Sequence, residues 1–302
     1  MLKRIAIKGI IGCWAGLFFM AVYADAAPVS VFVSIPPQRY FVQQIGKDLV
    51  SVQVMVRPGA SPATYEPKPI QMAAIAKADV YFSIGVPFED VWLEKIAAAN
   101  SEMQIVATDH GIEKLPMATH HHDHDGDFEG HEHGSGKGQG HHLDPHVWTA
   151  PLLVMQQART VATALKQIDP VHQNRYEANY ETFAAALTQL DRELREALEG
   201  FENRKFLVFH PSWGYFAQAY GLLQVPVEVE GKRPKPAHLH EIIEHARRDK
   251  IRVVFVQPQF STKSARTIAA AIGATVVVAD PLAEDWANNL RRQTHKFKDA
   301  LR

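Results

Sequence analysis

The chain has 302 residues but a single cysteine, Cys13, and this scarcity excludes two kinds of site. A lone thiol cannot form an intramolecular disulfide, and it cannot build a zinc site from several thiolates. Any metal held by the rest of the chain must therefore be bound by histidine, carboxylate or water. An excess of either charge is also missing, with 32 Lys and Arg against 33 Asp and Glu, so the composition gives no support for nucleic-acid binding or a basic membrane surface.

Common signatures of hydrolases and nucleotide-binding enzymes are absent as well. The sequence contains no His-Glu-x-x-His motif, no Gly-x-Ser-x-Gly turn and no phosphate-binding loop. The nearest string to a zinc-protease helix runs from His240 to His245, and its two histidines have the wrong spacing. A zinc-dependent hydrolase stays open as an alternative, because such enzymes also use three protein ligands and a water.

An uncharged apolar stretch near the start, residues 9–23, is too short for a comfortable membrane span. Three basic residues precede it, and Ala24-Asp25-Ala26 follows it with a small-x-small pattern, which is typical of a cleavable secretory signal peptide. We therefore expect residues 1–26 to be removed on secretion. The segment ending in Cys13 loosely resembles a lipoprotein cleavage box, which makes a lipid anchor at Cys13 the alternative.

Short β-rich runs alternate with helical stretches in both halves of the chain. This rhythm predicts an α/β fold of two (β/α)-type lobes with mostly parallel sheets. A stripe of apolar residues from Tyr176 to Leu198 recurs at spacings of three and four, which predicts one long backbone helix between the lobes. The expected strands are residues 29–34, 50–56, 79–84, 104–107, 205–209, 225–229, 253–257 and 275–279.

The expected units follow from this alternation. They are a signal peptide at residues 1–26, an N-terminal α/β lobe at 27–168, a linking backbone helix at 169–200 and a C-terminal α/β lobe at 201–302. Within the first lobe, Pro151 is expected in the first turn of a helix that Thr149 caps.

Histidines are concentrated in one polar tract, residues 120–142, which interrupts the N-terminal lobe. Neutral imidazole is the commonest protein ligand for zinc-like metals. The rest of the tract is mostly Gly, Asp and Glu, so it has little to bury and is expected to form a mobile loop. Its candidate accessory metal ligands are His120, His121, His122, His124, His131, His133, His141 and His142.

Three further candidate ligands stand at the ends of elements. His210 and Asp280 each directly follow a predicted strand, and ligands of parallel sheets bind beyond the carboxyl ends of strands. His146 lies just before a helix start, and Asp144 is placed to orient its imidazole. Two imidazoles and a carboxylate are a common zinc-type ligand set.

Several motifs occur in an order that resembles a known family. The motifs are Ser34-Ile35-Pro36-Pro37, Arg57-Pro58-Gly59-Ala60-Ser61-Pro62, Tyr65-Glu66-Pro67, Asp144-Pro145-His146-Val147-Trp148, Phe209-His210-Pro211-Ser212-Trp213-Gly214-Tyr215-Phe216, Gly231-Lys232-Arg233-Pro234 and Asp280-Pro281-Leu282. With these motifs the sequence strongly resembles the metal-binding solute-binding proteins of bacterial zinc and manganese ABC importers, over nearly all of the expected mature chain.

That resemblance implies a periplasmic protein that captures Zn²⁺ in a cleft between lobes and delivers it to an ABC transporter permease. It implies His146, His210 and Asp280 as metal ligands, and the His-rich tract resembles the zinc branch rather than the manganese branch. The protein is expected to be a monomer and not an enzyme. A periplasmic metal buffer or adhesin without transport is a further alternative.

The sequence departs from the family pattern at one ligand position. The family's first histidine lies in a segment like Pro-His-Thr-Tyr-Glu-Pro, and here its place is taken by Ala63. Alanine has no donor atom, so the fourth ligand stays open between water, a histidine of the tract and Glu66. Glu66 is also a candidate for orienting its own loop. The departure leaves room for a ligand other than a bare ion, such as a metal chelate.

Overall fold

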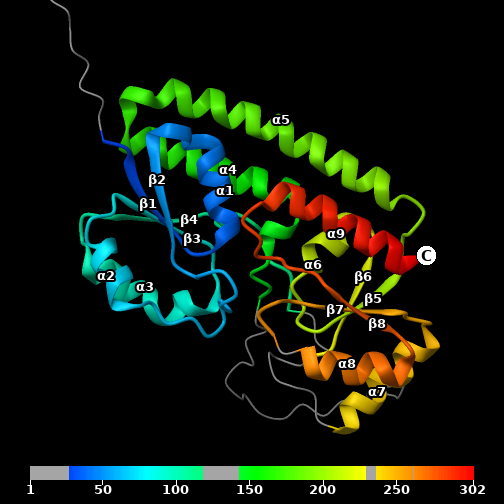
Figure 1. Cartoon of the computed structure of the whole chain (residues 1–302). Helices are drawn as coiled ribbons and strands as arrows, with labels where there is room; N and C mark the ends of the chain where they lie inside the picture. The colour runs from blue at the N-terminus through cyan, green and yellow to red at the C-terminus, as the bar shows by residue number, and fades with distance from the viewer. Residues whose placement is uncertain (1–26, 118–142, 229–235, 261) are drawn as a thin grey trace, which may run out of the picture.

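The computed structural model describes residues 27–117, 143–228, 236–260 and 262–302. The predicted signal peptide, the His-rich tract and the Gly231-Lys232-Arg233-Pro234 motif lie outside these described residues. The described chain forms two α/β lobes, each built on a four-stranded parallel sheet (Figure 1). The predicted fold class is therefore confirmed.

The N-terminal lobe has strands β1 (Val29–Val33), β2 (Val50–Val54), β3 (Val80–Ser83) and β4 (Gln104–Ala107), in the order β2-β1-β3-β4. Helix α1 (Pro36–Gly46) covers one face of this sheet, and α2 (Pro69–Ile75) and α3 (Pro87–Ala99) lie on the other side (Figure 1). A parallel sheet between helices is buried on both faces, which explains why β3 is buried along its whole length.

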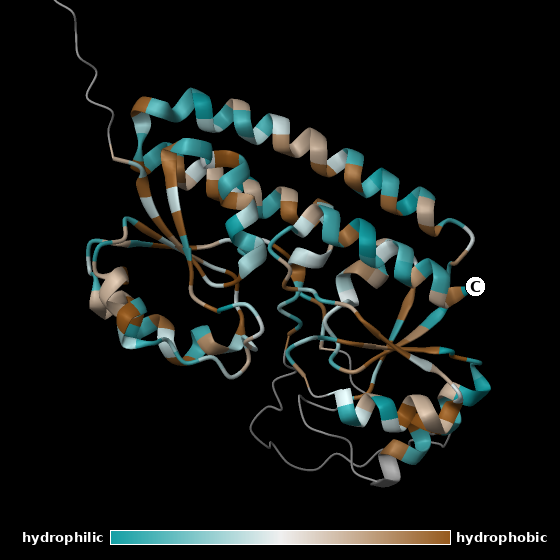
Figure 2. Ribbon diagram, in the orientation of Figure 1, coloured by the Kyte–Doolittle hydropathy of each residue, from teal (hydrophilic) through white to brown (hydrophobic). Residues whose placement is uncertain are grey.

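The C-terminal lobe repeats the same strand order. Its sheet is β6-β5-β7-β8, made of β5 (Lys205–Val208), β6 (Leu223–Pro226), β7 (Val253–Val256) and β8 (Thr275–Val278). Helices α6 (Gly214–Ala219) and α9 (Trp286–Leu301) lie above the sheet in Figure 1, and α7 (Pro236–Arg248) and α8 (Thr262–Ile272) lie below it. Figure 2 shows the strands of both lobes as largely hydrophobic, with the polar faces of the helices turned outward.

Two helices connect the lobes. Helix α4 (Pro151–Ile168) is followed by α5 (Gln173–Leu198), whose 26 residues span about 39 Å. Helix α5 packs against α1 and α4 at one end of the molecule and against α9 at the other (Figure 1). The long helix begins later than the predicted residue 169, because Pro170–His172 forms a separate 3-10 turn. Proline lacks an N–H and keeps the preceding Asp169 out of helical geometry.

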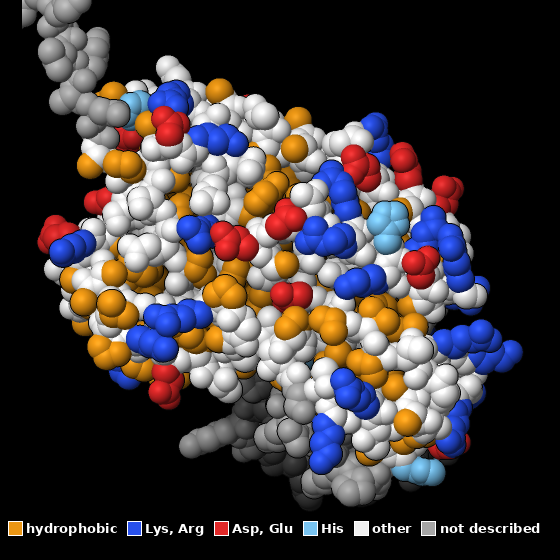
Figure 3. Space-filling model, viewed as in Figure 1, with side chains coloured by type: hydrophobic (Ala, Val, Ile, Leu, Met, Phe, Trp, Pro, Cys, Tyr) orange, Lys and Arg blue, Asp and Glu red, His pale blue; other side chains and the backbone are white. Residues whose placement is uncertain are grey.

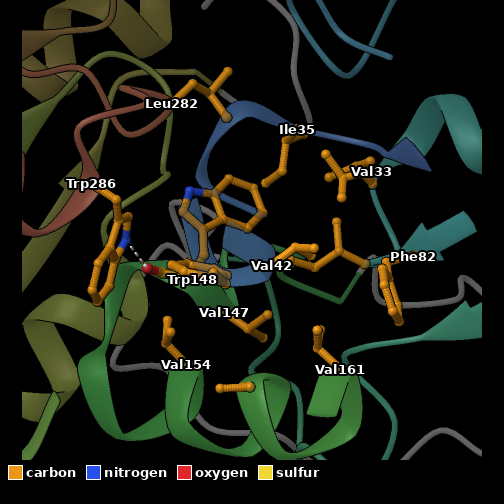
Figure 4. Packing of buried hydrophobic residues seen from close by; sticks show 14 of the residues in the cluster. Val33, Ile35, Val42, Phe82, Val147, Trp148, Val154, Val161, Leu282 and Trp286 are labelled. Atoms are coloured by element: carbon orange, nitrogen blue, oxygen red, sulfur yellow. Dashed lines mark hydrogen bonds between the residues drawn. The ribbon is translucent and has the colours of Figure 1, made fainter. Parts of the chain in front are cut away.

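Aromatic side chains fill the junction between the lobes. Phe41 of α1 meets Trp286 of α9 edge to face, with ring centroids 5.0 Å apart. Tyr40 lies between Trp286 and Phe183 of α5, at 6.0 and 5.9 Å. Figure 4 shows Trp286 beside Trp148, whose backbone carbonyl accepts a 2.8 Å hydrogen bond from the Trp286 indole. The two lobes therefore share a packed hydrophobic core.

Charges of both signs are interspersed over the face drawn in Figure 3, without a large patch of one sign. Among the described residues, no helix is long and apolar enough to cross a membrane.

Candidate metal site

A short 3-10 turn, Val147–Thr149, holds His146 at the start of the segment that leads into α4. The Asp144 carboxylate accepts a 2.6 Å hydrogen bond from His146 Nδ1, and the same oxygen accepts the His146 backbone N–H at 2.9 Å. The prediction that Thr149 caps α4 is wrong, because the N-cap residue is Ala150. The Thr149 hydroxyl instead donates to the His146 carbonyl at 2.9 Å, so it braces the turn that carries the histidine.

His210 stands immediately beyond the end of β5. Its Nδ1 lies 2.9 Å from Oε2 of Glu228, which follows the neighbouring strand β6 and is 4% exposed. Phe260 stacks on the imidazole with ring centroids 4.9 Å apart, and the Gln257 amide donates to the His210 carbonyl. Burial lowers the pKa of His210 below its ordinary value, although the Glu228 carboxylate works in the opposite direction.

The structure brings these two histidines together. Their ring centroids are 5.3 Å apart, and both side chains line the same cavity of about 60 Å³. Each ring uses Nδ1 for a buried carboxylate, which fixes the tautomer that presents Nε2 as a lone-pair donor. In this tautomer, the Nε2 atoms of both rings are able to bind the same cation. The remaining lining is Ser61, Pro62, Ala63, Val86, Pro87, Met117, Pro145, Trp148, Ser212, Gln257, Gln259, Phe260, Pro281 and Leu282.

Asp280 lies next to this cavity rather than in its wall. One of its oxygens accepts hydrogen bonds from the Gln259 side chain at 3.1 Å and the Leu282 backbone at 2.9 Å. It lines an adjoining hollow of about 210 Å³, which shares Gln259 and Leu282 with the first cavity. Within the described part of the chain, no three His, Cys, Asp or Glu side chains are close enough to hold a metal ion.

Among the described residues, the cavity wall that the N-terminal lobe contributes contains no imidazole or carboxylate. Ala63 lines the cavity, in the place where the sequence pattern expects a histidine. Glu66 is exposed and lines neither the cavity nor the adjoining hollow, so the structure does not bring it to the two histidines. The eight candidate histidines of residues 120–142 lie outside the described residues.

Hydrogen bonds tie the His146 turn to the C-terminal lobe. The Tyr215 hydroxyl, on α6, donates to the Asp144 carbonyl at 2.7 Å and accepts the Leu115 N–H at 3.0 Å. The Trp148 indole donates to the Pro281 carbonyl at 2.8 Å. A Cβ on Gly214 would come within 2.7 Å of the Asp144 carboxylate, so only glycine allows this close approach. His146 and His210 are consequently both fixed to the C-terminal lobe.

Sequence reasoning missed Glu228, which stabilises the orientation of His210. The signal was a charged residue directly after a β-rich run, in the segment Val225-Pro226-Val227-Glu228. Another buried carboxylate, Glu89 in the first turn of α3, does not line the cavity. Burial raises the pKa of Glu89 to about 7, while hydrogen bonds from Ser34, Ile84 and Gly85 work against that rise.

Comparison with known proteins identifies the family. The model of a family described as zinc-uptake complex component A, periplasmic, matches residues 31–300. The chain belongs to the ZnuA family. Members of this family are solute-binding proteins of transport systems and not enzymes, so the hydrolase alternative is set aside.

Individual relatives agree with this placement. The chain is 30% identical to the high-affinity zinc uptake system protein ZnuA of Bacillus subtilis (strain 168), over 82% of this chain and 76% of that protein. A crystal structure of ZnuA matches with 43% identity and a TM-score of 0.82, covering 91% of this chain and all of that one. An iron-binding protein of Yersinia pestis, YfeA, is 27% identical over 77% of this chain and 70% of that protein. Family membership therefore indicates zinc, while the range of relatives includes another metal.

Proposed function

We propose that this chain captures Zn²⁺ between its lobes and delivers it to the permease of an ABC importer. His146 and His210 bind the ion directly, and Asp280 supplies the third ligand. Asp280 is supported as a ligand by Gln259, which donates a hydrogen bond to its carboxylate and lines the histidine cavity as well as the adjoining hollow. The protein acts in the periplasm as a monomer, after removal of residues 1–26.

One observation carries this proposal: the imidazoles of His146 and His210 lie side by side, and the Nδ1 atom of each is hydrogen-bonded to a carboxylate. A histidine whose second nitrogen is bonded to a carboxylate is the usual form of a zinc-binding imidazole, because the carboxylate fixes the ring and raises its basicity. Imidazole also favours zinc over manganese, which prefers oxygen ligands. The zinc uptake systems among the relatives support the same choice.

The direct test replaces His210 by alanine and measures zinc affinity by calorimetry in the full chain. Loss of a ligand should weaken the tightest site by more than about 100-fold. Substituting a residue that is only hydrogen-bonded to a metal ligand already lowers metal affinity about 10- to 100-fold. His172→Ala is the matched control, because His172 Nδ1 is also held by a carboxylate, Asp169, at 2.7 Å but lies far from the cavity. Equal affinities in the two variants would refute the assignment.

Delivery to a permease needs a test in cells. Deleting the gene should lower uptake of ⁶⁵Zn at limiting zinc, and a plasmid copy of the wild-type chain should restore it. The His210→Ala chain should not restore uptake. Normal uptake in the deletion strain would instead favour a periplasmic buffer without transport.

The tract at residues 120–142 is assigned an accessory role. Its histidines are many and close in sequence, so they can form several weak two- or three-ligand clusters near His146. Deleting residues 120–142 should remove weak zinc equivalents and leave the tightest dissociation constant unchanged in a calorimetric titration. A sharply weaker tight site would mean that the tract supplies a ligand to the cleft.

A further inference from the structure

The wall that faces the two histidines from the N-terminal lobe offers no imidazole or carboxylate among the described residues. It consists of Ser61, Pro62, Ala63, Val86, Pro87 and Met117. The Ser61 hydroxyl accepts a hydrogen bond from the Ala63 backbone N–H at 3.3 Å. Zinc prefers four ligands, and the proposed ligand set of two histidines and one aspartate leaves one position for a further ligand.

The space beside the histidines exceeds what one ion needs. The cavity of about 60 Å³ has room for a few water-sized groups. Two of the residues that line it, Gln259 and Leu282, also line the neighbouring hollow of about 210 Å³. Together the two spaces have the size of a small organic molecule rather than of one ion.

The adjoining hollow also contains a group suited to an anion. Arg57 lines it and forms no ion pair with any described residue. Glu284, the second acid of that hollow besides Asp280, is paired with Arg39 at 3.3 Å. Guanidinium is the side chain best shaped to take a carboxylate.

From these observations we infer that the site takes zinc as a complex with a small carboxylate-bearing chelator. The chelator supplies the donor that Ala63 lacks, and one of its carboxylates binds Arg57 in the adjoining hollow. This inference rests on the proposed function, since it assumes that His146 and His210 hold the metal. It changes the substrate from a bare ion to a zinc–chelator complex.

The test uses the full chain with radiolabelled citrate and radiolabelled L-histidine as chelator probes. After gel filtration, the wild-type chain should retain about one equivalent of one of these probes only when zinc is present. Arg57→Gln should weaken retention of the probe about tenfold, the loss expected for one hydrogen bond to a charged group. Its affinity for zinc alone should not change.

Substitutions at Ala63 distinguish the effect of adding a metal ligand from the effect of adding a larger side chain. Ala63→His should bind zinc alone more than about tenfold tighter than the wild type and should no longer retain the probe, because the protein now fills the fourth position. Ala63→Val adds bulk without a donor and should bring no gain for zinc alone.

The inference is overturned if the wild type retains neither probe. The fourth ligand would then be water or a residue of the chain itself. It is also overturned if the wild type binds zinc alone as tightly as Ala63→His. Failure of the proposed function looks different, since zinc affinity would then be unchanged by His210→Ala.

Discussion

At the scale of single residues, the site depends on carboxylates that never need to touch the metal. Asp144 and Glu228 each hold the Nδ1 of one histidine, and both are almost fully buried. A buried carboxylate is costly unless it is hydrogen-bonded, so these pairs are built for orientation rather than for stability. The imidazoles are thereby oriented before any ion arrives.

Glu228→Gln should therefore weaken zinc binding about 10- to 100-fold while leaving the fold intact. The amide keeps the size of the side chain but loses the charge that fixes the ring. Asp169→Asn is the matched control, because it alters the same kind of pair at His172. Calorimetry on both variants measures the effect, and equal affinities would contradict an orienting role for Glu228.

Zinc affinity should depend on pH through the histidines. Burial lowers the pKa of His210, so this ring remains neutral and able to bind metal to a lower pH than an ordinary histidine. Its titration in the metal-free protein, followed by NMR, should have a midpoint below about 6.5. The zinc dissociation constant should rise as the pH falls, because protonation of either histidine competes with the metal. A midpoint above 6.5 would contradict the burial argument.

At the scale of elements, the turn that carries His146 is separated in the chain from the lobe that holds it. It precedes α4 and α5, yet Tyr215 of α6 and the Pro281 carbonyl fasten it to the C-terminal lobe. Both histidines therefore move together, and the described residues up to Met117 that face them form a wall without a histidine or carboxylate. Gly214 makes this contact possible by leaving room for Asp144.

Tyr215→Phe should weaken zinc binding about five- to tenfold, because the Asp144 carbonyl and the Leu115 N–H lose their partner. Tyr220→Phe is the control, since its hydroxyl donates to Asp191 at 3.1 Å, far from the cavity. The control should change the free energy of unfolding by a similar amount without changing zinc affinity. Zinc titrations and urea unfolding of both variants measure the two effects. An equal loss of affinity in the two variants would refute the proposed tether.

At the scale of the whole molecule, the two lobes are joined by a packed interface as well as by the connecting helices. Helix α5 contacts helices of both lobes, and the ring contacts among Phe41, Tyr40, Phe183 and Trp286 continue the core across the junction. Close-packed cores resist gradual deformation, so a large closing motion would have to break these contacts.

Binding of zinc should change the radius of gyration by less than about 1 Å, as in other pre-organised complexes. Small-angle scattering of the metal-free and zinc-loaded protein measures this change. The same comparison on a chain lacking residues 120–142 removes any contribution of that tract. A decrease of several ångströms in both chains would show hinge closure and contradict a rigid junction.

Much of this protein is determined by its sequence. Alternating β-rich and helical runs predicted two parallel sheets because each strand must be followed by a crossover. Strand β4 begins and ends where the sequence predicted, and Pro151 is in the first turn of α4 as predicted. The two histidines were also identified in advance, since each stands at the end or start of an element. Missing donor chemistry at Ala63 is equally a property of the sequence.

Only the tertiary structure decided which groups meet. The pairing of His210 with Glu228 depends on two strands being neighbours in the β6-β5-β7-β8 sheet, although the residues are 18 positions apart. The attachment of His146 to the C-terminal lobe depends on Tyr215 and Gly214, whose contacts with Asp144 cross about 70 positions. Local patterns determine elements because they act within a few residues, whereas a site is made by contacts that exist only after the elements have packed.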